Sequence, residues 1–232
     1  MHRARVHIAG GARIVRRVAC WGRSVKMLES GCVATGTKFL KFRCTRCGNC
    51  CKEPLLPLTD ADVRRIAGRT GDDPAEFVSW IDRFGIDMDD EPEAFVILRQ
   101  GRRVMVLRHD RQGCRYLGEN GCTIYSSRPS GCRIFPFDPR FDKQGKLRRL
   151  RLIDATDCQY ELDGENDVDS IRSLHQRHEG ATRAYHEKVA SWNTVQKRRR
   201  RAGKAAQSAR EFFEYLGFGS SRTGAALGSA RS

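Results

Sequence analysis

The last third of the chain carries apolar residues at the spacing of an amphipathic helix. The residues on this predicted face are Ile171, Leu174, His178, Ala181, Tyr185 and Trp192. Their recurrence every three or four positions predicts a long helix that follows a polar linker at 163–169 and continues into the basic stretch at 197–204. A last short helix is predicted around Phe212 and Phe213, and the Gly/Ser/Ala-rich segment from Gly217 onward is predicted to be disordered.

Two shorter helices are predicted nearer the middle of the chain. Thr59 can cap the first, with Asp62 at its third position as in a capping box. Asp73 can cap the second, with Pro74 at its first position. Four apolar residues of this second segment are spaced i, i+3, i+4 and i+7, so we expect them on one buried helical face. They are Phe77, Trp80, Ile81 and Phe84.

Residues 94–108 have the composition of a β-hairpin. The segments AFVILR and VMVLR are β-branched and apolar, and Gln100-Gly101 lies at the expected turn. The acidic stretch at 87–93 is predicted to be a solvated loop before this hairpin. Helices and a hairpin in one chain indicate the α+β class.

The composition limits the class of protein. With 232 residues, 39% of them hydrophobic, the chain suits one modest globular domain plus extensions. It has no run of 18 apolar residues, so a transmembrane helix is not expected. Arginines interrupt the apolar positions near the N-terminus, which does not fit a secretory signal. Two interpretations of residues 1–26 stay open. They could form a transit peptide, or translation of the natural protein could start at Met27.

The net charge of +15 raises the hypothesis of nucleic-acid binding. Residues 1–39 carry +7, residues 40–160 carry +4 and residues 161–232 carry +4. The charge therefore belongs mainly to the extensions. The basic stretch at 197–204 could contact phosphates, but a solvated helix end is the favoured interpretation, so nucleic acid is a possible and not a favoured partner. No membrane partner is expected.

The cysteines point to metal. Ten cysteines are about 4% of the chain, fewer than small disulfide scaffolds contain. Because no export signal is expected, disulfides would not persist, and a cytoplasmic location follows as an expectation. Cysteines used this heavily inside a cell usually bind metal.

Eight of the cysteines form a specific pattern. Cys44, Cys47, Cys50 and Cys51 make a C-x2-C-x2-C-C knot, and Cys114, Cys122, Cys132 and Cys158 follow it. Two residues between thiolates let both sulfurs point at one centre, and Gly48 permits the tight backbone that this requires. Because neighbouring side chains diverge, Cys50 and Cys51 could serve two metals or two edges of one cluster. The alternatives are buried apolar thiols and a redox dithiol made by Cys44 and Cys47. Cys20 and Cys32 lie outside the pattern.

The same residues carry a resemblance to a known family. The segments are FRCTRCGNCC (42–51), LTDADVRRIA (58–67) and CRYLGENGCTIYSSRPSGCRIFPF (114–137). They resemble the zinc- or iron-chelating domain family, also called the YkgJ-like CxxCxxCC cysteine-cluster proteins, which includes the flagellin lysine N-methylases. The resemblance covers roughly residues 40–160. It implies a metal ligand set of Cys44, Cys47, Cys50, Cys51, Cys114, Cys122, Cys132 and Cys158.

Other residues near the third segment fit supporting roles. Guanidinium groups could neutralise a thiolate-rich centre, and the candidates are Arg115, Arg128 and Arg133. Tyr125 and Phe135 are expected to pack over the site and keep water out. A ligand role is open to His109, whereas His178 is expected to be a satisfied core histidine.

We therefore predict an α+β fold, with a small irregular metal-centred domain followed by a C-terminal helical extension. The predicted parts are a basic disordered arm (1–39), an eight-cysteine metal-binding domain (40–160) and a helical extension with a basic, partly disordered tail (161–232). The expected cofactor is an iron–sulfur cluster, with [4Fe–4S] preferred, or Zn²⁺. The functional alternatives are an iron–sulfur oxidoreductase, a structural zinc module and a protein lysine N-methyltransferase-like enzyme. A redox partner or protein substrate is not identified by the sequence.

Overall fold

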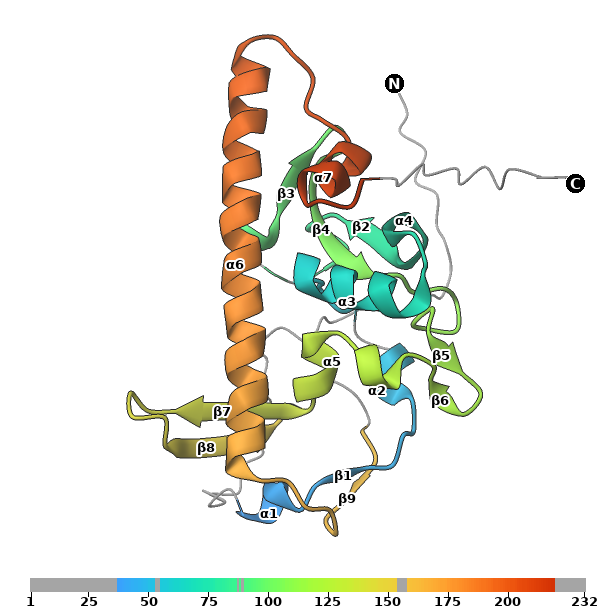
Figure 1. The fold of residues 1–232 in the computed structure, drawn as a ribbon, viewed down its shortest axis with the longest axis vertical. Helices are drawn as coiled ribbons and strands as arrows, with labels where there is room; N and C mark the ends of the chain where they lie inside the picture. Colours follow the sequence, from blue (N-terminus) through green and yellow to red (C-terminus); the bar gives the residue numbers. More distant parts are fainter. Residues whose placement is uncertain (1–36, 53–54, 87, 89, 154–157, 220–232) are drawn as a thin grey trace, which may run out of the picture.

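The computed structural model describes residues 37–52, 55–86, 88, 90–153 and 158–219. Most of the predicted basic arm, the tail from residue 220, Cys20 and Cys32 lie outside these residues. One long helix, α6 (Val168–Arg201), runs along the molecule in Figure 1, and the other elements lie beside it. A three-stranded sheet lies beside the C-terminal half of α6, and the cysteine-bearing elements lie toward its N-terminal half (Figure 1).

The fold is α+β, as predicted. The other helices are α1 (Thr37–Leu40), α2 (Asn49–Lys52), α3 (Asp60–Thr70), α4 (Pro74–Phe77), α5 (Ser130–Ile134) and α7 (Ala209–Tyr215), with 3₁₀ turns η1 (Pro92–Ala94) and η2 (Tyr125–Ser127). The strands are β1 (Arg43–Cys44), β2 (Val78–Ile81), β3 (Val96–Leu98), β4 (Gly101–Leu107), β5 (Leu117–Gly118), β6 (Gly121–Cys122), β7 (Phe137–Phe141), β8 (Leu147–Leu152) and β9 (Tyr160–Glu161).

The predicted hairpin is confirmed as β3 and β4. These strands pair antiparallel, with Val96 opposite Arg103 and Leu98 opposite Gly101. Gly101 has φ 106°, a left-handed conformation that suits glycine at the turn. β4 is the central strand of the sheet, in the order β2-β4-β3. Because both neighbours satisfy its backbone, β4 can bury its apolar residues.

The prediction that residues 77–84 form one buried helical face is wrong. The helix α4 ends at Phe77, and the next four residues form β2, whose Val78 lies opposite Leu107 and whose Ile81 lies opposite Val104. Pairing with β4 satisfies the backbone of this segment, and this long-range interaction overrides the local spacing. Phe77 is buried as expected, whereas Phe84 is 85% exposed.

The predicted helix caps are confirmed. The Thr59 side chain accepts a hydrogen bond from the Asp62 backbone N–H, and the Asp62 side chain accepts one from Thr59. Asp73 caps α4 by accepting a hydrogen bond from the backbone N–H of Ala75. Each cap satisfies backbone donors that the first turn leaves unpaired, so these local motifs fix where α3 and α4 begin.

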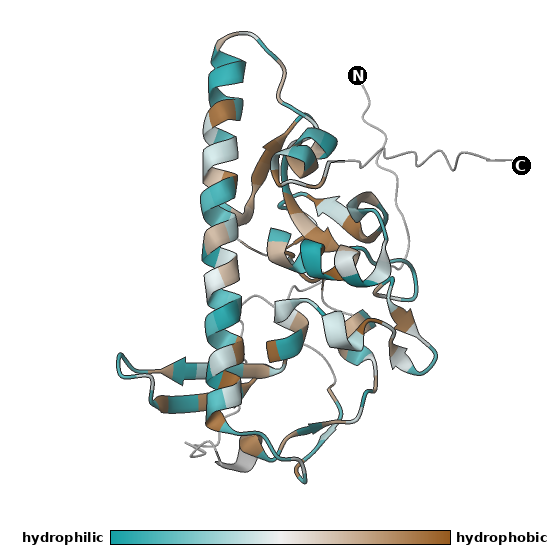
Figure 2. Cartoon of the chain, viewed as in Figure 1, coloured by the Kyte–Doolittle hydropathy of each residue, from teal (hydrophilic) through white to brown (hydrophobic). Residues whose placement is uncertain are grey.

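The long helix α6 is confirmed, and at 1.5 Å per residue its 34 residues span about 50 Å. Its buried side chains are Ile171, Tyr185, Val189, Trp192 and Gln196. Figure 2 shows hydrophobic bands that recur along a largely hydrophilic helix, while β3 and β4 are mainly hydrophobic. The basic residues Arg198–Arg201 form its last turn, where positive charge complements the helix dipole. Among the described residues, no helix combines the length and apolarity needed to cross a membrane.

Side chains of α6 also protect the edge strand β3. Asn193 accepts a hydrogen bond from the Ile97 N–H at 2.7 Å, and the Trp192 indole donates one to the Ile97 carbonyl at 2.9 Å. A sheet edge left unpaired would be open to association with other chains. The helix thus fastens to the sheet through polar as well as apolar contacts.

The main hydrophobic core joins elements that are far apart in the sequence. Val63 and Ile66 of α3, Val96 of β3, Trp192 of α6 and Phe212 of α7 belong to one cluster. A separate cluster packs Phe42, Ile134, Phe137, Leu150 and Ile171 together at the other end of the molecule. Residues from both sides of position 160 contribute to these cores, and the predicted domain boundary there stays a prediction.

Candidate metal centre

The knot is folded by two left-handed residues. Arg46 has φ 60° and Gly48 has φ 77°, so the chain turns sharply twice between the end of β1 and the start of α2. The Arg46 backbone N–H donates to the Cys44 sulfur at 3.3 Å, and the Cys51 N–H donates to the Gly48 carbonyl at 2.9 Å. Gly48 therefore takes the conformation expected from the sequence.

The second cysteine block docks directly on the knot. The Cys114 backbone N–H donates to the Cys51 carbonyl at 2.6 Å, and the Tyr116 N–H donates to the Cys114 sulfur at 3.4 Å. Gly113 makes the docking possible, because a Cβ added there would lie 2.6 Å from the Cys51 carbonyl oxygen. Sequence reasoning missed this role of Gly113, because its partner Cys51 lies more than 60 positions away.

Two further cysteines enter the site from short elements. Cys122 is in β6, opposite Leu117 of β5, and Cys132 is in α5. The helix α5 is fixed by Asp62, a carboxylate only 2% exposed, which accepts a hydrogen bond from the Ser130 N–H at 2.8 Å. Sequence reasoning found Asp62 as a cap for α3 and missed this second role.

Cys44 lies in a separate two-stranded ribbon, and Cys158 lies two residues before the second strand of that ribbon. β1 pairs antiparallel with β9, and Cys44 lies opposite Tyr160. The Thr45 hydroxyl donates to the Gln159 carbonyl at 2.8 Å, so the backbone beside Cys158 lies next to the knot. Cys44 is exposed and Cys158 is half-buried, packed against the cluster around Phe42. The ribbon brings the first and the last of the eight cysteines to one end of the molecule.

The remaining thiols influence one another electrostatically. The pKa of Cys114 is raised to about 11, chiefly by burial, with Cys122 and Cys50 adding to the effect. The pKa of Cys132 is raised well above its usual value by burial, and Cys114, Cys50 and Cys122 contribute. Burial also raises the pKa of Cys122. A hydrogen bond with Cys51 is the main cause of the raised pKa of Cys50, to which Cys47 contributes. The thiols of Cys50, Cys114, Cys122 and Cys132 thus share one neighbourhood.

Of the three candidate arginines, Arg128 acts on these thiols. Its charge lowers the pKa of Cys50, Cys122 and Cys132, against the larger effects that raise them. Arg115 forms an ion pair with Glu76 at 3.3 Å. Arg133 donates a hydrogen bond to the Ser126 carbonyl. Arg128 differs from Arg115 and Arg133 in that its charge acts on the thiols. The sequence alone did not distinguish the three arginines.

The two aromatic residues expected to shield the site from water, Tyr125 and Phe135, are only partly buried. Tyr125 is 43% exposed and has two guanidinium groups over its ring, with Arg128 3.6 Å and Arg46 5.1 Å from the ring centroid. The cation–π contact with Tyr125 holds the Arg128 charge near the thiols. Phe135 is half-buried, in the residue that ends α5.

The two histidines that the sequence singled out have different surroundings. The backbone of His109 forms an isolated antiparallel bridge with Cys114, so His109 lies beside the site. His178 Nδ1 lies 2.9 Å from the Ser130 hydroxyl, and burial lowers the pKa of this histidine. His178 is thus a core histidine with a hydrogen-bond partner, as predicted.

The donor set suits zinc or iron, because both metals accept thiolate ligands. Cys44, Cys47, Cys50, Cys51, Cys114, Cys122 and Cys132 are thiols outside any disulfide. Among the described residues, no three His, Cys, Asp or Glu side chains lie close enough together to hold one metal ion as they stand. The chemistry of the residues therefore fits the metal, while their side-chain positions are not those of a closed coordination sphere.

Comparison with known families identifies the cysteine-bearing region. The model of the CxxCxxCC family, described as a putative zinc- or iron-chelating domain, matches residues 43–159. The match spans half of the chain and includes all eight cysteines of the predicted set. Neither the curated proteins nor the solved structures gave a match. The chain belongs to the CxxCxxCC family of zinc- or iron-chelating domains.

Proposed function

We propose that this protein binds an iron–sulfur cluster through its cysteines, with [4Fe–4S] preferred to zinc. Family membership supports metal binding in general. The observation that carries the proposal is the shared neighbourhood of Cys50, Cys114, Cys122 and Cys132, which come from four separate segments. Thiols gathered in this way oxidise unless they are liganded or kept reduced.

The proposal assigns the eight cysteines to two sets. The inner set is Cys50, Cys114, Cys122 and Cys132, and the outer set is Cys44, Cys47, Cys51 and Cys158. Four ligands complete one four-coordinate ion or one cubane cluster, so the inner set is sufficient for a first centre. The outer set supplies a second centre or a second edge of the same cluster. Arg128 offsets part of the negative charge that four thiolates bring.

Anaerobic purification tests the identity of the metal. We expect a coloured protein that contains iron and acid-labile sulfide, measured by elemental analysis, sulfide assay and visible absorption. Reduction with dithionite should bleach the absorption if the cluster is redox-active. A colourless protein with stoichiometric zinc and no iron would contradict the proposal.

A structural zinc module is the second candidate, and the hydrophobic core weighs against it. The cluster that includes Leu58, Phe77, Met105, Val189 and Phe212 is built without any of the eight proposed ligands except Cys114, with Cys51 and Cys122 packed at its margin. A fold that needs zinc would unfold on chelation. We expect chelation to open the cysteine-bearing loops and to leave the sheet intact, as hydrogen exchange can show.

A reaction is proposed only through the family resemblance. An iron–sulfur oxidoreductase and a flagellin lysine N-methylase-like methyltransferase both stay predictions. Incubation with S-adenosylmethionine and candidate protein substrates, followed by mass spectrometry, tests the second. Absence of methyl adducts on every substrate would count against it. A cytoplasmic location is part of the proposal, because a reducing compartment keeps unliganded thiols from forming disulfides.

A further inference from the structure

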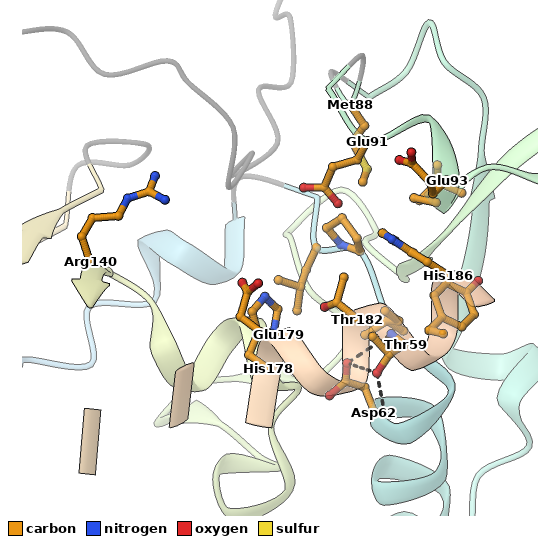
Figure 3. A pocket seen from close by; sticks show the side chains of 17 residues that line it. Thr59, Asp62, Met88, Glu91, Glu93, Arg140, His178, Glu179, Thr182 and His186 are labelled. Atoms are coloured by element: carbon orange, nitrogen blue, oxygen red, sulfur yellow. Dashed lines mark hydrogen bonds between the residues drawn. The ribbon is translucent and has the colours of Figure 1, made fainter. Parts of the chain in front are cut away.

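A cavity of about 360 Å³ lies between α6, α3 and the segment before β3, apart from the proposed ligands. Glu91 and Glu93 line it from that segment, and Glu179 lines it from α6 (Figure 3). Its volume lies within the range of small-molecule pockets. It shares a wall with the metal centre, because Gly131, the residue before Cys132, lines it.

The three carboxylates have no counterion among the residues that the structure describes; Glu91 is half-buried, and Glu93 and Glu179 are exposed. Among the described residues, none of Glu91, Glu93 and Glu179 belongs to an ion pair or donates or accepts a side-chain hydrogen bond, although ion pairs are frequent elsewhere in the protein. The pKa of Glu91 is raised by burial and, after that, by the charges of Glu179 and Glu93. Glu91 therefore lies close enough to both of the other acids to be repelled by them.

The other polar groups of the cavity do not neutralise this charge. His178 and His186 line it, but burial lowers the pKa of both, so at neutral pH both imidazoles are uncharged. Arg140 also lines it, yet this guanidinium lies apart from the acids in Figure 3 and forms an ion pair with Asp138 at 3.5 Å.

A second observation points to a missing binding partner. Tyr185 lines the same cavity, is 3% exposed, and its hydroxyl has no hydrogen-bond partner among the described residues. A buried hydroxyl left without a hydrogen-bond partner destabilises the fold. A ligand with several N–H donors would satisfy both the carboxylates and a hydroxyl acceptor.

We infer that this cavity binds a small organic cation that carries an ammonium or guanidinium group. A divalent metal ion is the alternative occupant, and Mg²⁺ binding is one outcome of the tests below. Planar or tetrahedral N–H donors can instead reach carboxylates that are spread around a cavity wall. The inference does not depend on which metal the cysteines bind.

Isothermal titration calorimetry of the full chain with agmatine, which carries both groups, tests the inference. We expect saturable binding of one agmatine. Glu91→Gln and Glu179→Gln should each weaken binding roughly tenfold, because each removes a charge-assisted contact. The matched control is Glu165→Gln, which makes the same charge change at an exposed residue outside the cavity and should leave the affinity unchanged.

Thr182→Arg gives a second, independent test. Thr182 lines the cavity from α6, and an arginine there would supply the cation internally. We expect this variant to lose agmatine binding and to melt at a higher temperature than the native chain, as circular dichroism can measure. Absence of saturable binding at millimolar agmatine would overturn the inference. So would an equal loss in Glu165→Gln, or binding of Mg²⁺ in place of agmatine that depends on Glu91.

Discussion

The two ends of the molecule are held together by different means. Beside the C-terminal half of α6, the three-stranded sheet is covered by α3 and α7, and buried apolar side chains such as Val96, Met105 and Phe212 fill the space between them. The cysteine region is built from strands of two residues and helices of four or five. Backbone hydrogen bonds, one buried carboxylate and the thiols connect these pieces.

This difference shows where metal has most to contribute. A region with a large apolar core gains its stability from burial. A region of short elements gains little in this way, and it needs bonds between distant segments to stay ordered. We therefore expect metal loss to affect the cysteine region and core substitutions to affect the sheet region.

The largest expected effect is loss of the metal. Cys114→Ser removes the most buried thiol of the inner set and should abolish metal binding, measured as metal content per chain. Cys44→Ser, at an exposed cysteine of the outer set, should retain at least part of the metal. Equal retention in both variants would show that the division into inner and outer sets is wrong.

Acid should weaken metal binding over several orders of magnitude. The raised pKa values of Cys114, Cys122 and Cys132 mean that these thiols are protonated at neutral pH before metal binds. Binding must release those protons, so the affinity falls as pH falls, by about tenfold per pH unit for each proton released. Competition with a chelator of known affinity between pH 6 and pH 8 would measure the slope. A pH-independent affinity would contradict thiolate ligation by this set.

In the sheet region, the largest effect is expected at Trp192. Trp192→Ala removes a side chain that is 4% exposed and packs edge-on against Phe212, and it should cost about 3–5 kcal/mol of unfolding free energy. Val195→Ala, at a residue 47% exposed on the same helix, should cost far less. Denaturant unfolding with the metal content held constant gives both values. If Trp192→Ala released the metal without lowering stability, the two regions would not be separable.

The smallest effect concerns the cap of α7. Ser208 and Glu211 form a capping box, and Ser208→Ala should cost about 1 kcal/mol. Hydrogen bonds from Ser208 chiefly lower the pKa of Glu211 to about 2. The stabilisation from this carboxylate is therefore complete above its ordinary pKa and is lost as pH falls through about 2. Tryptophan fluorescence can follow this loss, because Trp80 and Trp192 both pack against Phe212 of α7, and Glu214→Gln serves as the control.

Elements fixed by local interactions were predicted correctly from the sequence. The periodicity of α6, the caps at Thr59 and Asp73, and the hairpin turn at Gly101 each depend on residues within a few positions of one another. The eight-cysteine pattern was also sufficient to identify the family, since ligand spacing is itself local within the knot.

Contacts between distant residues decided the rest. The segment after Phe77 is a strand because its backbone pairs with that of β4. This pairing cannot be predicted from the local spacing of apolar residues. The docking of Gly113 on the knot, the proximity of Arg128 to the thiols, and the cluster of acids around Glu91 likewise arise from residues tens of positions apart. The sequence determined which residues could bind metal, and tertiary packing decided which of them meet, because the free energy of long-range pairing exists only in the assembled chain.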